Sequence, residues 1–125
     1  MTILQVLVVE DNERNMKLFC DVLTASGYRT LEATTGERAV ELALEHGPDL
    51  VLMDIQLPGI DGVEALGRLR ADDRFASSPV LALTAQAMEG DRERFLAAGF
   101  DGYLSKPVDI GEFVATVRRY CDGSG

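Results

Sequence analysis

Short apolar runs that each end in a polar or charged residue constrain this chain more than any other feature. Four of them follow one another along the sequence: Val6–Val9, Leu50–Met53, Val80–Leu83 and Tyr103–Leu104. Continuous apolar runs of this kind are typical of strands buried on both faces of a parallel sheet. The segment Arg29–Ala33 is interpreted as one more strand. The sequence therefore predicts five strands.

Helical patterns separate these strands. Asn12 offers an N-cap to a helix that carries apolar residues at helical spacing and ends at Gly27. Further helices are predicted over Gly36–His46, from the Gly62 region to about Arg70, over Met88–Ala98, and after an Asp109 cap. The last helix has an apolar stripe made of Ile110, Phe113, Val114, Val117 and Cys121.

Five strands alternating with five helices predict an α/β fold with a parallel sheet covered on both faces. With 125 residues the chain has the size of one domain. We expect residues 1–125 to form that single domain, with residues 122–125 as a loose tail.

Composition restricts the classes of function. Twelve basic and 21 acidic residues leave a net charge of −9, the opposite of what nucleic acid attracts, so direct DNA binding is not expected. The sequence has no apolar stretch long enough for membrane insertion and begins without the basic region of a secretory signal. Two cysteines, Cys20 and Cys121, are too few for a disulfide framework or a zinc site. We expect a cytoplasmic protein with reduced thiols.

Chemically active side chains gather where the predicted strands end. Ligands of open parallel sheets bind outside the carboxyl ends of the strands, and these ends carry Glu10, Asp11, Asp54, Thr84 and Lys106. Three carboxylates in one place repel one another unless a cation relieves them. An oxygen-only site with two or three acidic groups suits Mg²⁺, which commonly shares its coordination sphere with phosphate oxygens. The sequence therefore predicts a Mg²⁺ site that receives a phosphoryl group.

A carboxylate can itself be the nucleophile in phosphoryl transfer. Asp54 is the best candidate, because it ends a central buried strand and precedes a loop with Pro58 and Gly59. Lys106 is expected to neutralise one phosphoryl oxygen, and the Thr84 hydroxyl to donate a hydrogen bond to another.

Segments from four strand ends resemble the receiver family of two-component response regulators. They are Val8–Asn12, Leu52–Gly62, Leu83–Ala85 and Ser105–Pro107. The resemblance runs from about Val6 to Cys121, and it implies a flavodoxin-like (βα)5 sandwich with strand order 2-1-3-4-5.

The resemblance also implies roles for individual residues. A sensor histidine kinase or a histidine phosphotransferase would donate phosphate to Asp54. Asp11, Asp54 and the backbone carbonyl of Gln56 would hold Mg²⁺, with Glu10 acting through water. Thr84 and Tyr103 would rearrange on phosphorylation, and the Lys106–Pro107 peptide bond would be cis.

A phosphorylated switch of this type signals through protein contact. We expect the downstream protein to bind the face formed by the Met88–Ala98 helix, the Tyr103–Leu104 strand and the last helix. The side chains near this face are Met88, Glu89, Arg92, Tyr103 and Phe113, of which Phe113 could instead belong to the core. The resemblance places Gln56 and Gln86 where family members tune the lifetime of the phosphorylated form.

Three other interpretations compete with a phosphorylated switch. The chain could be a receiver module cut from a hybrid histidine kinase. A phosphatase of the haloacid dehalogenase class would need a second aspartate two residues after Asp54, where this chain has Gln56. A flavin carrier would need a phosphate-binding loop after the first strand, where Glu10 and Asp11 would repel phosphate. The sequence thus favours a phosphoacceptor switch over an enzyme that acts on a separate substrate.

Overall fold

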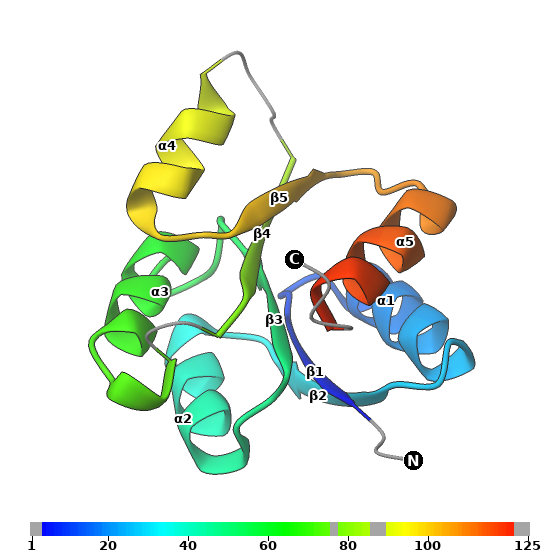
Figure 1. Cartoon of the computed structure of the whole chain (residues 1–125), viewed down its shortest axis with the longest axis horizontal. Coiled ribbons are helices and arrows are strands. Elements are labelled where there is room, and N and C mark those ends of the chain that lie inside the picture. Colours follow the sequence, from blue (N-terminus) through cyan, green and yellow to red (C-terminus); the bar gives the residue numbers. More distant parts are fainter. Residues whose placement is uncertain (1–3, 76–77, 86–89, 122–125) are drawn as a thin grey trace.

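The computed structural model describes residues 4–75, 78–85 and 90–121. Its centre is a sheet of five parallel strands in the order β2-β1-β3-β4-β5 (Figure 1). The strands are β1 (Gln5–Val9), β2 (Arg29–Ala33), β3 (Leu50–Asp54), β4 (Val80–Thr84) and β5 (Gly102–Ser105). The predicted flavodoxin-like strand order is confirmed.

Helices cover both faces of the sheet. They are α1 (Glu13–Ala25), α2 (Gly36–His46), α3 (Gly62–Arg70), α4 (Asp91–Ala98) and α5 (Ile110–Cys121), with a short 3₁₀ turn at Asp73–Phe75. Figure 1 shows α1 and α5 together on one face and α2, α3 and α4 on the other. Side-chain caps fix several helix starts: Asn12, Thr35 and Asp61 each accept a hydrogen bond from a backbone N–H in the first turn.

Each strand alternates its side chains between two cores. In β1, Val6 and Val8 pack on the α1 and α5 side, whereas Leu7 and Val9 pack on the α2, α3 and α4 side. All four are fully buried, and burying an aliphatic side chain of this size contributes roughly 1.5–3 kcal/mol. Apolar residues on both faces therefore fix the central position of β1 and the register of its neighbours.

Two sequence-based expectations are wrong in detail. Helix α4 begins at Asp91 rather than at Met88, because Gly90 has φ 89°, a left-handed conformation that interrupts a helix. Ile110 is half exposed and does not belong to the buried stripe of α5, which consists of Phe113 and Val117 with Val114 and Cys121 partly covered. The predicted tail, residues 122–125, and the side chains of Gln86, Met88 and Glu89 lie outside the described residues.

Neither Cys20 nor Cys121 forms a disulfide bond with a described residue. Within the described ranges, every helix is too short or too polar to cross a membrane.

Candidate functional site

Three carboxylates meet at the carboxyl ends of two neighbouring strands. Glu10 and Asp11 follow β1, and Asp54 is the last residue of β3, which pairs with β1. One carboxylate oxygen from each residue lies within 4.8 Å of the others. Glu10 is 1% exposed and Asp54 is 5% exposed, whereas Asp11 is open to solvent. The cluster therefore has a buried floor and an accessible side.

Lys106 supplies the positive charge of this cluster. Its backbone N–H donates a 2.7 Å hydrogen bond to the Thr84 carbonyl, which fixes the loop that leaves β5. Its ammonium Nζ lies 2.7 Å from Asp54 Oδ2 and also pairs with Glu10 Oε1. The peptide bond from Lys106 to Pro107 is cis. One cation thus bridges the two buried carboxylates.

Backbone donors hold the same two carboxylates from the other side. The N–H of Gln56 donates to Asp54 Oδ1 over 2.9 Å, and the N–H of Asn12 donates to Glu10 Oε2 over 3.1 Å. Each buried carboxylate is therefore oriented by a backbone N–H on one oxygen and by Lys106 on the other. The role of the Gln56 carbonyl stays a prediction.

The protonation of the site follows from burial and charge. Burial raises the pKa of Glu10 above its ordinary value, and the nearby Asp54 adds to the rise, whereas Lys106 and the Asn12 N–H oppose it. Burial alone would lower the pKa of Lys106, but hydrogen bonds to Asp54 and Glu10 outweigh it and raise this pKa. Lys106 is therefore charged at neutral pH and faces more than one negative group.

The remaining predicted residues lie on the adjoining strands. Thr84 ends β4 next to β3 and is 6% exposed. Tyr103 lies in β5 and packs its ring against Phe95 of α4, with 5.7 Å between the ring centroids. Phe113 stacks on Phe19 of α1 at 5.3 Å and belongs to the core rather than to the predicted face. The structure thus brings Glu10, Asp11, Asp54 and Lys106 together and places Tyr103 apart from them, towards α4.

Gly62 is a site residue whose role the sequence reasoning missed. A Cβ added to it would overlap the carbonyl oxygen of Asp54 and would lie 3.0 Å from Cα of Ile55. Its N–H donates to the Ile55 carbonyl over 3.0 Å, which folds the loop after β3 back onto the strand end. In the sequence Gly62 signalled only a loop or helix start, because nothing there shows which backbone it would approach.

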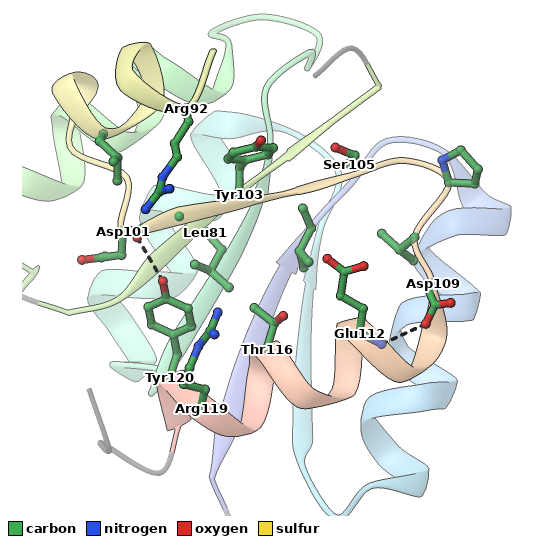
Figure 2. A pocket seen from close by; sticks show the side chains of 15 residues that line it. Leu81, Arg92, Asp101, Tyr103, Ser105, Asp109, Glu112, Thr116, Arg119 and Tyr120 are labelled. Atoms are coloured by element: carbon green, nitrogen blue, oxygen red, sulfur yellow. Dashed lines mark hydrogen bonds between the residues drawn. The ribbon is translucent and has the colours of Figure 1, made fainter. Parts of the chain in front are cut away.

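A groove lies beside this site, between α4 and α5. We call it the β5 groove; its volume is about 500 Å³ (Figure 2). Its lining includes every residue from Asp101 to Ser105, with Arg92 and Leu96 from α4 and Glu112, Thr116, Arg119 and Tyr120 from α5. The groove thus coincides with the face at which the sequence placed the downstream protein.

Known proteins share both the sequence and the fold of this chain. Residues 6–118 match the family model of the response regulator receiver domain. The polar-differentiation response regulator DivK of Brucella anthropi is 50% identical over 115 residues, which cover 92% of this chain and 94% of DivK. DivK of Brucella ovis is 49% identical over the same share of both chains.

Solved structures agree with this relationship. A putative response regulator of Chloroflexus aurantiacus matches with a TM-score of 0.91 and 30% identity, covering 97% of this chain and 99% of its own. The receiver domain of sensor histidine kinase PA1611 of Pseudomonas aeruginosa, solved with a magnesium ion in its active-site cleft, matches with a TM-score of 0.89 and 36% identity over the same shares. The acidic cluster with its bridging lysine, the strand order and these similarities together show that the chain belongs to the response regulator receiver domain family of two-component signalling.

Proposed function

We propose that Asp54 accepts a phosphoryl group from a phosphohistidine of a sensor histidine kinase or a histidine phosphotransferase. The observation that carries this proposal is the environment of Asp54: a buried carboxylate at a strand end, held by the Gln56 N–H and paired with Lys106. In the transfer, a carboxylate oxygen of Asp54 forms a bond to phosphorus while the bond from phosphorus to the imidazole nitrogen breaks. The donor imidazole keeps the electron pair of that bond and takes up a proton.

Positioning and charge neutralisation are what this chain supplies to the reaction. Lys106 already lies within hydrogen-bond distance of Asp54, so its ammonium can donate a hydrogen bond to an oxygen of a phosphoryl group attached there. Thr84 ends the adjacent strand, where its hydroxyl can donate to a second phosphoryl oxygen.

The residues present fit Mg²⁺. The cluster offers only oxygen ligands and has an accessible side at Asp11. Among the described residues, Lys106 is the cation that pairs with its carboxylates, and their negative charge exceeds the charge of this one lysine. Asp11, Asp54 and the Gln56 carbonyl would hold the ion, with Glu10 acting through water. When bound, Mg²⁺ would supply positive charge for the phosphoryl oxygens.

Phosphorylation would act by changing the affinity of this chain for a downstream protein. We propose that Thr84 and Tyr103 shift together, because β4 and β5 are paired at Ala82 and Tyr103 and at Thr84 and Ser105. Tyr103 lines the β5 groove, so its movement changes the surface offered by α4, β5 and α5 to a downstream protein. The net charge of −9 makes DNA an unsuitable partner.

The proposed protein is a switch and not an enzyme acting on a separate substrate. A phosphatase of the haloacid dehalogenase class needs a proton donor two residues after its nucleophile. That position is Gln56, whose amide has no acidic proton and whose backbone N–H is engaged with Asp54.

Beryllofluoride, which mimics an aspartyl phosphate, tests this proposal. In ¹H–¹⁵N spectra, beryllofluoride with Mg²⁺ should shift the amides of Gln56, Ala85 and Lys106, and the change should extend to Tyr103. The Asp54→Ala variant should show none of these shifts. If the wild-type amides stay in place, or if the variant responds equally, the assignment of Asp54 is wrong.

A further inference from the structure

The outer edge of β5 is an open sheet edge. β5 is the last strand in the sheet and, among the described strands, pairs only with β4. Backbone groups alternate in direction along a strand. The Lys106 N–H points to Thr84 in β4, so the backbone groups of Leu104 point to β4 as well. Those of Tyr103 and Ser105 therefore point away from the sheet.

Tyr120 covers one end of this edge. Its hydroxyl donates a 3.0 Å hydrogen bond to the carbonyl of Asp101, the residue that immediately precedes β5. Gly102 makes this possible, since a Cβ there would lie 2.8 Å from the Tyr120 hydroxyl. The open part of the edge thus runs from Tyr103 to Ser105, and no described residue bonds to its outward backbone groups.

The β5 groove follows this edge. Its walls come from helices on opposite faces of the sheet, α4 and α5, and its floor includes consecutive residues of β5. A groove with walls from both faces must run along the rim of the sheet rather than over either face (Figure 2). A chain lying in it would therefore be level with β5, where the next strand of the sheet would be.

Charge gives the groove a direction. Arg92 of α4 and Arg119 of α5 flank the end near Asp101, and Asp109 and Glu112 lie towards Ser105 (Figure 2). Asp101 is already paired with Arg70 at 2.9 Å. Neither Arg92 nor Arg119 takes part in an ion pair of the described residues. One end of the groove thus offers positive charge and the other end negative charge.

We propose that the β5 groove binds an extended segment of the partner protein, which joins the sheet as a sixth strand. Its backbone pairs with the outward groups of Tyr103 and Ser105, an acidic side chain lies between Arg92 and Arg119, and a basic side chain lies near Glu112. This rests on the proposed function, because it specifies how the downstream protein is recognised. Main-chain hydrogen bonds provide the affinity of such a contact, and alternate side chains provide its specificity. A helical segment would leave the outward groups of Tyr103 and Ser105 unpaired, because its own backbone is internally bonded.

Two short peptides of opposite charge order test the proposal. The probes are acetyl-Glu-Val-Thr-Val-Lys-amide and acetyl-Lys-Val-Thr-Val-Glu-amide, each added to ¹⁵N-labelled protein with and without beryllofluoride and Mg²⁺. One charge order should bind at least fivefold more tightly than the other, shift the amides of Tyr103 and Ser105, and slow their hydrogen exchange at least tenfold. A copy methylated on its three central amides should bind at least fivefold more weakly, because it has lost its strand donors.

Charge reversal provides a matched control. Arg119→Glu should reduce the preference between the two peptides at least fivefold, whereas Arg118→Glu, an exposed neighbour outside the groove, should leave it unchanged. The proposal is overturned if neither peptide shifts Tyr103 and Ser105, if the methylated copy binds equally, or if light scattering shows a dimer that Arg119→Glu dissociates. The beryllofluoride response of the Asp54 region in the same samples reports on the phosphoryl site, so a failure at the groove is separate from a failure of the proposed function.

Discussion

Lys106 Nζ lies 2.7 Å from Asp54 Oδ2, although 52 residues separate the two in sequence. The same ammonium pairs with Glu10, so a single cation serves two buried carboxylates. The strand ends therefore carry more negative than positive charge. A bound metal ion can reduce this excess, and a phosphoryl group on Asp54 can change which oxygen atoms Lys106 contacts.

Replacing Lys106 should destabilise the fold. In Lys106→Met the carboxylates of Glu10 and Asp54 lose their shared partner, and breaking a buried pair from one side costs about 3–5 kcal/mol. Urea unfolding should show that the free energy of unfolding falls by an amount near the lower end of this range, because the lysine side chain is 16% exposed. Millimolar Mg²⁺ should restore part of the lost free energy of unfolding. Lys17→Met, which removes the exposed i,i+4 pair with Asp21, should change stability by less than about 0.5 kcal/mol. Equal losses in the two variants would contradict the bridging role of Lys106.

Glu10→Gln should stabilise the metal-free protein at neutral pH while weakening its affinity for Mg²⁺. Burial raises the pKa of Glu10 above its ordinary value near 4.5, so the folded state holds this proton more tightly than the unfolded state. The contribution of Glu10 to folding therefore declines as the pH rises from about 4.5 through the raised pKa. The variant should gain stability over the wild type across this window, by about 1.4 kcal/mol for every tenfold by which the folded state binds the Glu10 proton more tightly than the unfolded state.

Chemical denaturation between pH 4 and pH 7 measures this difference. Glu13→Gln provides the control, since Glu13 is exposed in the first turn of α1 and its loss should cost only a few tenths of a kcal/mol. A stability difference between wild type and Glu10→Gln that is constant with pH would show that Glu10 carries no raised pKa.

Gly62→Ala should disturb both folding and the site. The new methyl group would overlap the Asp54 carbonyl, and all the atoms that it meets belong to the backbone of Asp54 and Ile55, which cannot move aside as a flexible side chain could. We expect a loss of at least about 2 kcal/mol, in the range of other overpacked sites, and a weaker response to Mg²⁺. Gly67→Ala is the matched control in the same helix: nothing lies within 4 Å of its Cβ, and it should gain about 0.5–1 kcal/mol. Thermal unfolding of the pair distinguishes close approach at Gly62 from a general effect of alanine in α3.

Arg70 should be a major contributor to stability outside the site. Its guanidinium donates to the carbonyls of Gly99, Phe75 and Ser78 and to Asp101, tying the end of α3 to the end of α4 and the start of β5. Truncation leaves these acceptors without their donor, so Arg70→Ala should cost about 2–3 kcal/mol. Arg68→Ala removes only an exposed pair with Glu64 and should cost less than about 0.5 kcal/mol in the same urea titration. Similar costs for the two variants would refute the anchoring role.

The sequence predicted those parts of the site that depend on topology. Parallel strands bring their carboxyl ends to one edge, so polar residues after apolar runs were enough to place Glu10, Asp54 and Lys106 together. It could not predict features that depend on the path of a loop. The approach of Gly62 to Asp54 and the anchoring by Arg70 arise from backbone positions that no local pattern encodes. The predicted start of α4 was wrong because Gly90 takes a left-handed conformation. The spacing of apolar residues does not reveal a change of φ at a single residue.

The most direct test of Asp54 as the phosphoacceptor is intact mass after incubation with acetyl phosphate. We expect a single added phosphate in the wild type with Mg²⁺, none without Mg²⁺, and none in Asp54→Ala. Asp61→Ala, which removes a nearby carboxylate that caps α3, should still be phosphorylated. A phosphate adduct that persists in Asp54→Ala, or a wild type that forms neither this adduct nor a complex with beryllofluoride, would show that Asp54 is not the phosphoacceptor.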